Sequence, residues 1–468
     1  MTGSPLGPAP RPAILSRAGS PLCRAGVRAL RFVSQVAAGL LALGAPALAG
    51  QLWVVDAAGG AGHDFTQLSA AVAAAGEGDT LLVRAGVYGD AVVFDKGLRI
   101  VARTAGTPPV GEAVVVRGLS VRGLQAGKHV LLSGLTFTGD EAALSLKNNA
   151  GGVWIEDCAG LGAKGVGLVA APNFHKAGHP GLVAENCAEV VVLRSTFQGG
   201  DGHDGFVFPT LDTGAGGAGA ELREVARAVV HGSELTGGRG GNTDNDDDWW
   251  PGQPGGHGLV LDQSTALVMG STLRGGAGGQ GGEEYDLIFG TTTCGDGGAG
   301  GSGVAVTGST LETSANVFLP GAGGPPFGGS DCSFGPDGLP FAFSVATLTD
   351  LGAAAFALEL PASASPGDAV AVEVGGPWQS PAWMWVAPAP ALAAPLPGIV
   401  GDPLVSAGGG VLVPLGKAPT TLALTVPPLP VAALPQWFFA QSVGFDALGT
   451  GGLVLGEAQA LVVVPPGS

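Results

Sequence analysis

Four short strings decide the fold of this chain: Arg194-Ser-Thr-Phe, Gly232-Ser-Glu-Leu, Gly270-Ser-Thr-Leu and Gly308-Ser-Thr-Leu. Each begins 38 residues after the one before it, and the first three run on into Gly-Gly at Gly199, Gly237 and Gly275. An internal repeat of this length is typical of a solenoid, in which every repeat stacks on its neighbours. We therefore expect all four strings to stack on one another in register.

Apolar runs of strand length lead into these strings. Val130 to Phe137 aligns with Val190 to Phe197, and further copies are expected over 228–235, 266–273 and 304–311, with 153–155 in an intermediate repeat. A second strand is expected over 182–184, 221–222 and 259–261, and a third over 206–208 and 287–289. Three short strands need only about 20–25 residues, so each repeat should also carry a long loop after its Gly-Gly pair. These loops should leave from the same corner of the solenoid.

Residues 64–102 carry a second pattern. Asp64-Phe-Thr leads into a short apolar helix over 67–75, which Asp64 or Thr66 is expected to cap. Gly78-Asp-Thr-Leu-Leu-Val, Ala85-Gly-Val-Tyr and Gly97-Leu-Arg-Ile-Val follow. This order resembles the N-terminal cap and first coil of secreted bacterial proteins of the pectate-lyase-like, right-handed parallel β-helix superfamily. The resemblance implies an all-β right-handed parallel β-helix over residues 50–335, and it says little about activity.

The composition changes near residue 335, where Gly-Gly pairs become rare and proline increases. Seven strands are expected beyond this point, over 341–345, 354–360, 369–374, 411–413, 421–426, 437–443 and 460–464. Their spacing predicts a β-sandwich over residues 336–468. Residues 437–461 are also similar to a C-terminal β-module found on secreted bacterial repeat proteins.

The first 49 residues have the organisation of a secretory signal peptide. A basic region with five arginines precedes an apolar run over 32–43 and a small-residue cleavage site at Ala47-Leu-Ala49. Its removal would change the net charge from −17 to −22. So acidic a protein is a poor partner for nucleic acid or an anionic membrane, and no later stretch is expected to span a membrane. We expect a secreted or cell-surface location.

Four cysteines remain after such cleavage: Cys158, Cys187, Cys294 and Cys332. An even number in an oxidising compartment predicts two disulfides, Cys158–Cys187 between neighbouring coils and Cys294–Cys332 across a Gly/Pro-rich loop. The alternative is that these cysteines are free buried thiols.

Acidic side chains in the long loops suggest a Ca²⁺ site, which is the one cofactor that the sequence predicts. Gly199 to Val207 fits a calcium-binding nonapeptide, and Asn242 and Gln280 stand 38 and 76 residues after Asp204. Hard cations bind clustered oxygens. The predicted ligands are Asp201, Asp204, Asp244, Asp246, Asp248, Glu283 and Glu284. In the alternative, these residues only form solvated turns.

Aromatic residues in the same loops suggest a carbohydrate ligand. Trp249, Trp250 and Tyr285 could stack on sugar rings, or they could fold back to cover the solenoid. Catalytic interpretations are weaker. Asn242-Thr-Asp with Gly256-His-Gly is similar to motifs of polygalacturonase-type hydrolases, but here these motifs crowd into one loop. A lyase would need a basic residue, and the candidates Arg194, Arg239 and Arg274 could equally have ordinary structural roles. No catalytic residue is assigned.

The leading hypothesis is therefore a non-catalytic protein of the cell exterior that binds a polysaccharide or a cell-envelope glycan through loops at one corner of the solenoid. The alternatives are a polysaccharide lyase or glycoside hydrolase, and a purely structural component of the envelope.

Overall fold

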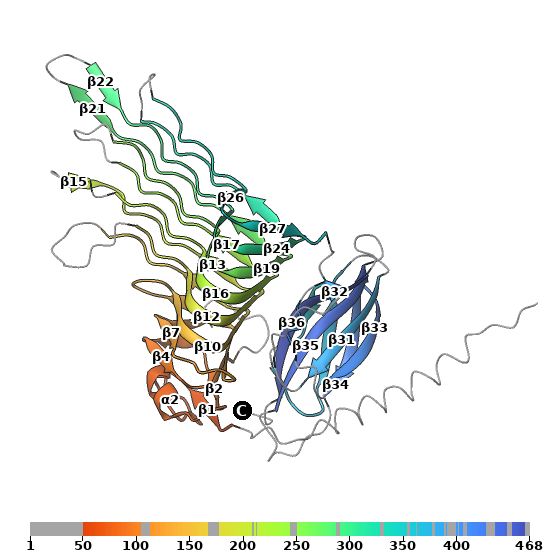
Figure 1. Cartoon of the computed structure of the whole chain (residues 1–468). Coiled ribbons are helices and arrows are strands. Elements are labelled where there is room, and N and C mark those ends of the chain that lie inside the picture. The colour runs from red at the N-terminus through yellow and green to blue at the C-terminus, as the bar shows by residue number, and fades with distance from the viewer. Residues whose placement is uncertain are drawn as a thin grey trace, which may run out of the picture. The chain divides into compact units, whose positions relative to one another are not determined.

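The computed structural model of the chain (Figure 1) describes most of the sequence after residue 49. The described residues are 50–103, 113–166, 177–207, 210–211, 213–243, 250–286, 291–327, 332–352, 356–361, 363–376, 380–387, 390, 399–400, 402–405, 410–426, 436–446 and 452–463. The expected signal peptide lies outside them. No described helix is long and apolar enough to span a membrane.

Two large sheets of parallel strands dominate the structure, as Figure 1 shows. The 15-stranded sheet contains β1 (Leu52–Val55), β2 (Thr80–Val83), β4 (Ala91–Phe94), β5 (Arg99–Ala102), β7 (Leu119–Arg122), β8 (His129–Ser133), β10 (Leu144–Glu156), β12 (Leu182–Leu193), β16 (Ala220–His231), β18 (Leu259–Asp262), β19 (Thr265–Met269), β23 (Val304–Thr307), β24 (Thr310–Ser314), β26 (Phe341–Ser344) and β27 (Thr347–Asp350). The 8-stranded sheet contains β3 (Gly86–Tyr88), β6 (Val114–Val116), β9 (Leu135–Thr138), β11 (Ala159–Leu161), β13 (Thr196–Gln198), β17 (Glu234–Thr236), β20 (Thr272–Arg274) and β25 (Val317–Leu319). The strands pair largely in chain order, so successive repeats lie on top of one another.

Side chains of equivalent strands form columns inside this stack. One column is formed by buried residues that occupy paired positions: Val130, Val153, Val190, Ala228, Ala266 and Leu311. Because side chains alternate between the two faces of a strand, every second residue joins this interior. The result is one continuous apolar core from Val55 to Leu311.

Three of the four 38-residue strings stack as the sequence predicts. The backbone N–H of Arg194 donates to the carbonyl of His231, that of Gly232 to Met269, and that of Gly270 to Ser314. Arg194, Gly232 and Gly270 all have positive φ, between 44° and 59°, so the chain turns sharply there before the next strand begins. Glycine adopts this conformation without strain, which explains why the repeat uses it.

The fourth string stacks at a different corner, so the prediction for it was wrong. Thr310 pairs with Thr265, and the N–H of Gln263 donates to the carbonyl of Thr307. Gly308-Ser-Thr-Leu therefore stacks on Gln263-Ser-Thr-Ala. The segment that stacks on Gly270-Ser-Thr-Leu is Ala315-Asn-Val-Phe. The expected copy over 304–311 consequently begins on β18 rather than on β19.

Both corners use serine for the same purpose, and this explains the error. At the first corner the N–H of Ser195 donates to Ser233 Oγ at 3.1 Å, and that of Ser233 to Ser271 Oγ at 3.1 Å. At the second corner the N–H of Ser264 donates to Ser309 Oγ at 2.9 Å. A buried N–H at a turn needs an acceptor, so a Gly-Ser-Thr string arises at either corner.

A short helix lies beside the first strands. Helix α2 (Leu68–Ala74) buries Leu68, Ala71 and Val72, close to the helix predicted over 67–75. The predicted cap is wrong, because Gln67 occupies the N-cap position and makes no side-chain cap. The carboxylate of Asp64 instead accepts the N–H of Val54 at 2.8 Å.

The parallel stack continues to Asp350, past the boundary predicted at residue 335. β26 pairs with β23 and β27 with β24 in the same parallel sheet. The first of the seven predicted C-terminal strands is therefore the last repeat of the stack. Its Phe341 ring packs 4.3 Å from that of Phe318, measured between centroids.

The region after residue 356 is mainly antiparallel. One sheet has β28 (Leu358–Glu359), β30 (Ala369–Val374) and β34 (Thr420–Thr425). The other has β29 (Ser363–Ala364), β31 (Pro381–Ala387), β32 (Ile399–Val400), β33 (Val411–Lys417), β35 (Gln436–Asp446) and β36 (Gly452–Val463). The sequence analysis did not predict β31, a central strand in which Trp383 and Trp385 alternate with buried Ala382 and Met384.

One of the two predicted disulfides is present. Cys294 and Cys332 are joined, with their Cα atoms 5.9 Å apart. Cys158 and Cys187 are free and buried, so the expected bridge between them is absent. Cys187 faces Asn149 and Val225 on the neighbouring strands, and the Sγ of Cys158 approaches the carbonyl of Leu132 at 3.6 Å. Burial raises the pKa of the Cys158 thiol to about 12.

Candidate functional site: a glycine plate and its distal end

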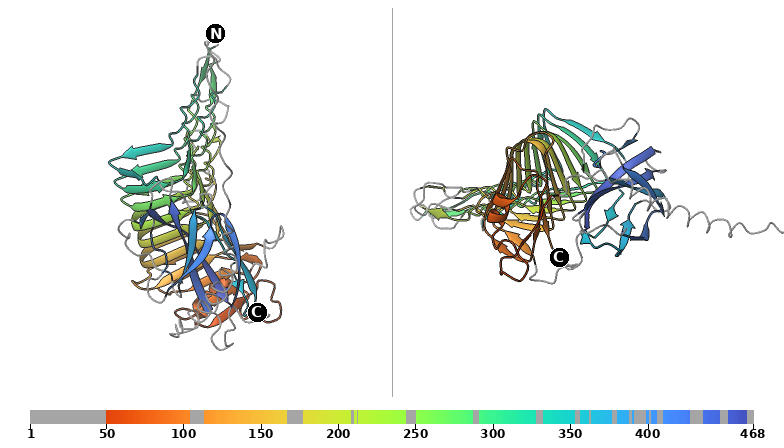
Figure 2. Two further views of the ribbon diagram at one scale, coloured as in Figure 1. Left: turned by 90° about the vertical axis from the view of Figure 1, so that its right-hand side faces the viewer. Right: turned by 90° about the horizontal axis from the view of Figure 1, so that it is seen from below.

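The long loops after the Gly-Gly pairs are not irregular. In each repeat the chain runs outward from the 8-stranded sheet and returns to the 15-stranded sheet, and Figure 1 shows these segments as parallel wavy traces. We call them together the glycine plate: outward segments 199–205, 237–243, 275–282 and 320–326, and returning segments 213–219, 251–258, 295–303 and 333–340. Seen edge-on in Figure 2 (left), they form a narrow stack.

Hydrogen bonds join neighbouring segments at every third residue. The N–H groups of Gly199, Gly202 and Gly205 donate to the carbonyls of Thr236, Arg239 and Asn242, at 2.9, 2.8 and 3.0 Å. Those of Gly237 and Gly240 continue the pattern into the third outward segment. A period of three residues is that of the polyproline II helix, which has no internal hydrogen bonds and needs neighbours to satisfy its backbone.

A second set of hydrogen bonds joins the outward layer to the returning layer. These bonds form a zigzag that crosses the whole plate, with distances of 2.8 to 2.9 Å. In the following series, the N–H of each residue after the first donates to the carbonyl of the residue named before it: Gly200, Gly217, Gly238, Gly256, Gly276, Gly301, Gly321 and Gly338. The backbone therefore replaces side chains as the interior of this part of the protein.

Glycine fills most inner positions of the plate because the backbones there approach too closely for a side chain, and Gln253 is an exception. A Cβ atom on Gly238 or Gly301 would lie under 3.0 Å from the carbonyl oxygen of a neighbouring segment, closer than real Cβ atoms come. Two of every three positions face such a neighbour, and the third faces outward. The same rule places glycine at the crowded axis of collagen.

The outward-facing position carries Asp201 and Asp204, two of the seven acids that the sequence assigned to calcium. Asp201 Oδ1 accepts the N–H of Arg239 at 2.8 Å, and Asp204 Oδ1 accepts that of Asn242 at 2.9 Å. Asn242 Oδ1 in turn accepts the N–H of Gln280 at 2.8 Å. The oxygen that recurs every 38 residues therefore satisfies the one N–H in three that points away from the plate.

Two cations complete this outer network. Lys164 Nζ lies 2.8 Å from Asp204 Oδ2, and the Arg239 guanidinium lies 2.8 and 3.0 Å from the two Asp204 oxygens. Burial alone would raise the pKa of Asp204, but hydrogen bonds from the Asn242 N–H, Lys164 and Arg239 lower it to about 2. Arg239 is thereby ion-paired and is not available as a catalytic base.

Replacing Asp204 tests this network. Asp204→Ala leaves the Asn242 N–H and two cations without their acceptor, so we expect a loss of about 1–3 kcal/mol in the free energy of unfolding at pH 7. Asp204→Asn keeps an acceptor for the N–H and should cost less. The folded pKa lies below the ordinary value, so this stabilisation is present above pH 3.8 and is lost as the pH falls through about 2. Urea denaturation at several pH values measures it, and an Asp204→Ala variant as stable as the wild type would contradict it.

The last layer of the plate ends in proline. The outward positions equivalent to the donors Gly275, Gly278 and Gly281 are Pro320, Gly323 and Pro326, as the bonds from these donors to residues 319, 322 and 325 show. Proline has no N–H to leave unpaired, and the N–H of Gly323 donates to Asp337 Oδ1 at 2.8 Å. In the returning layer Pro340 is the position equivalent to the donor Gly303, as the bond from the Gly303 N–H to the Leu339 carbonyl shows.

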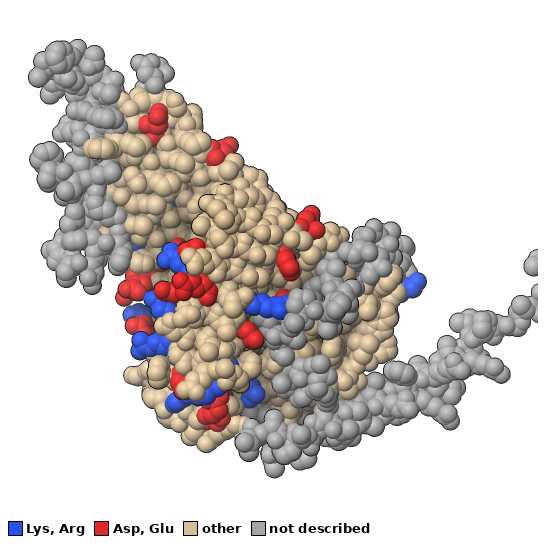
Figure 3. All heavy atoms as spheres, viewed as in Figure 1, with Lys and Arg blue, Asp and Glu red and all other residues tan. Residues whose placement is uncertain are grey.

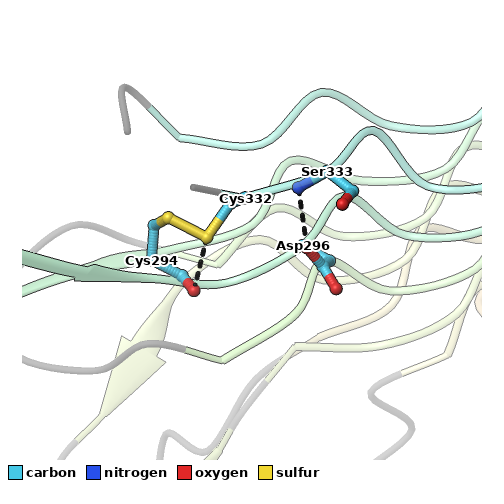
Figure 4. Close-up of a disulfide and its surroundings, with 4 residues drawn as sticks. All are labelled: Cys294, Asp296, Cys332 and Ser333. Atoms are coloured by element: carbon cyan, nitrogen blue, oxygen red, sulfur yellow. Dashed lines mark hydrogen bonds between the residues drawn. A yellow bond between two sulfur atoms is a disulfide. The ribbon is translucent and has the colours of Figure 1, made fainter. Parts of the chain in front are cut away.

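The far end of the plate brings together residues from different repeats. Two antiparallel hairpins stand there, β14 (Phe206–Val207) with β15 (Thr210–Leu211), and β21 (Glu283–Asp286) with β22 (Thr291–Cys294). Phe206–Val207 is thus a hairpin strand and not the third stacked strand that was predicted. The Cys294–Cys332 disulfide joins the second hairpin to the next repeat, and beside it Asp296 Oδ1 accepts the N–H of Ser333 at 2.8 Å (Figure 4).

Three aromatic residues are predicted to bind a ligand, and Trp250 is the one whose side chain the structure describes. Its side chain is 41% exposed, and its carbonyl accepts the N–H of Gly282 at 3.0 Å, next to Glu283 at the start of β21. Trp249, Asp244, Asp246 and Asp248 lie outside the described residues, as do residues 287–289. For Tyr285 and Glu284 the backbone in β21 is described and the side chains are not.

No described group of three or more His, Cys, Asp or Glu side chains is placed to hold a metal ion. On the face shown in Figure 3, charged side chains gather mainly over the early repeats and few lie over the plate. The calcium site stays a prediction, and most of its remaining acids lie outside the described residues.

The residues considered for catalysis have structural partners. The ring nitrogen Nδ1 of His257 accepts the N–H of Ser302 at 2.9 Å, and burial lowers the pKa of His257. Arg194 pairs with Glu156 at 2.5 Å and with Asp157 at 2.9 Å. Arg274 ends β20 with an exposed side chain. Among the described residues, these contacts do not bring the hydrolase or lyase candidates together at one site.

Comparison of the chain with protein-family models, with curated proteins and with solved structures gives no match. The site is therefore interpreted from its own geometry.

Proposed function

We propose that this chain is a non-catalytic protein of the cell exterior that binds a polysaccharide or a cell-envelope glycan with the distal end of the glycine plate. Its stacked repeats would form a right-handed parallel β-helix of the pectate-lyase-like kind, and its antiparallel region a β-sandwich. The predicted signal peptide and the Cys294–Cys332 disulfide support an oxidising, extracellular location.

The observation that carries this proposal is the position of Trp250. It lies at the end of a segment fixed to its neighbours by backbone hydrogen bonds, yet its side chain stays 41% exposed. An exposed indole is costly to keep in water and is a common surface for stacking on a sugar ring.

The plate explains how such a surface would be held ready. The hydrogen bond from the Gly282 N–H to the Trp250 carbonyl fixes the start of one hairpin beside the aromatic residue of the previous repeat. A preorganised surface loses less conformational entropy on binding than a set of mobile loops. The structural partners of His257, Arg194 and Arg239 further support a role without catalysis.

Trp250→Ala is expected to reduce glycan binding about 5- to 12-fold, since stacking of one aromatic residue contributes on the order of 1–1.5 kcal/mol. Phe94→Ala is the matched control, because Phe94 is 63% exposed on β4, away from the plate. Binding of the chain without residues 1–49 is measured on a panel of immobilised polysaccharides, while release of reducing ends and unsaturated products is followed. Turnover, or unchanged binding by Trp250→Ala, would refute the proposal.

We also propose that Ca²⁺ binds Glu283 together with the ligands predicted from the sequence, Asp244, Asp246, Asp248 and Glu284. Ca²⁺ would offset the repulsion among these carboxylates. Removing it with a chelator should lower the melting temperature, and adding excess Ca²⁺ should restore it. A melting temperature that does not respond to the chelator would remove calcium from the proposal and leave the Trp250 prediction standing.

A further inference from the structure

A second candidate site lies away from the plate, around Arg99 on β5. Ile100 belongs to the core, so the side chain of Arg99 points to the opposite face of the 15-stranded sheet. Its guanidinium carbon lies 5.5 Å from the centroid of the Trp437 ring, and its Nη1 donates to the carbonyl of Gly78 at 3.1 Å. Among the described residues, no carboxylate forms an ion pair with it.

Arg99 lines a cavity of about 380 Å³. Its other lining residues include His129, Trp154, Glu189, Pro390 and Phe439. The Trp154 and Phe439 rings meet edge to face, with centroids 5.8 Å apart, so part of the wall is aromatic. Cavities of this size with mostly apolar walls and a few polar groups are typical of sites for small molecules.

The charges around the cavity favour an anion at the Arg99 end. Glu77 also lines it, but its carboxylate accepts the Gly97 N–H at 3.0 Å and faces Lys128 Nζ at 3.6 Å. Glu189 is on β12, and β8 and β10 lie between that strand and β5. The Glu189 carboxylate reaches back over Gly152 on β10, roughly two strand spacings or about 9 Å from β5, so it lies toward the other end of the cavity from Arg99.

The guanidinium has donors to spare. Arginine offers five N–H groups and stays charged in proteins, and one of them is used by Gly78. Burial lowers the pKa of Arg99, which shows that its charge is poorly compensated. Contact with Trp437 offsets only part of the cost of removing the charge from water.

We propose that this cavity binds a small organic carboxylate with a ring, of the sugar-acid class, whose carboxylate pairs with Arg99 while its ring packs against Trp154. Carboxylate and guanidinium match in a two-bond geometry that a neutral sugar cannot offer. The site is independent of the distal end of the plate, because none of its lining residues belongs to the plate.

Calorimetric titration with sodium glucuronate, and with glucose as the neutral probe of similar size, tests the proposal. The wild type should bind glucuronate at least tenfold more tightly than glucose, and 0.5 M NaCl should weaken that binding. Arg99→Met should lose at least tenfold in affinity. Arg122→Met, an exposed arginine on β7, should bind as the wild type does.

A second variant protects the test against misfolding. Arg99→Lys keeps a charge over Trp437 but loses the paired donors, so it should show intermediate affinity and a melting temperature close to that of the wild type. The proposal is overturned if the wild type binds neither probe, if it binds both equally, or if Arg99→Met and Arg99→Lys both retain full affinity for glucuronate.

Discussion

Gly238→Ala is expected to lower the free energy of unfolding by about 3 kcal/mol, although it adds only one methyl group. The new Cβ would lie under 3.0 Å from the carbonyl oxygen of Gly200, and that atom is backbone, which cannot rotate away. Separation of the two segments would also stretch the hydrogen bonds that link Gly217, Gly238 and Gly256. A collagen chain is disrupted by a glycine substitution for the same reason.

The matched control is Ala277→Val, at an exposed outward position of the next segment, which should change stability by less than about 0.5 kcal/mol. Urea denaturation gives the free energies, and hydrogen exchange locates the damage. In Gly238→Ala the amides of the plate segments 199–205, 213–219, 237–243 and 251–258 should exchange faster, while those of β12 and β16 remain protected. Equal stability of Gly238→Ala and the wild type would show that the plate is not close-packed.

Loss of the Cys294–Cys332 disulfide is the second large effect. The bridge closes a loop of 38 residues, for which chain entropy gives about 4 kcal/mol of stabilisation. The Cys294→Ser/Cys332→Ser double variant should therefore become sensitive to proteases at the β21–β22 hairpin and in the return segment after Cys332. The rest of the stack should stay resistant.

Cysteine labelling provides the control for that experiment. In the folded wild type Cys158 and Cys187 should resist alkylation, because both are buried and burial raises the pKa of both thiols. Non-reducing peptide mapping after unfolding should recover both of them labelled, and only Cys294 and Cys332 linked. A Cys158–Cys187 link, or a double variant as protease-resistant as the wild type, would contradict the structure.

The sequence predicted the stacked strands well because their signal is local. Val190 to Phe197 and Ala228 to Leu235 carry apolar residues at strand period, and their 38-residue spacing fixes which strands pair. The register of the last repeat could not be predicted in this way. Two corners share the same need for a serine acceptor, so identical strings fit both.

The plate was not predicted, for a different physical reason. Glycine has no local preference that separates a turn from an extended segment, and the polyproline II helix forms no hydrogen bonds within itself. A signal was nevertheless present: Gly275-Gly-Ala-Gly-Gly-Gln repeats with a period of three, whereas turns show no such period. The stacking of these segments also explains why an oxygen side chain recurs at Asp204 and Asn242, because each accepts a backbone N–H of the next segment.

The prolines of the last layer set a limit on how this protein can be lengthened. A further repeat added after Asp350 would meet Pro320, Pro326 and Pro340, which offer it no N–H. The three prolines would also weaken any attempt by two molecules to join plate to plate into a fibre. A longer array would thus need glycine at these three positions, and such a variant would be the natural starting point for building a synthetic fibre from this chain.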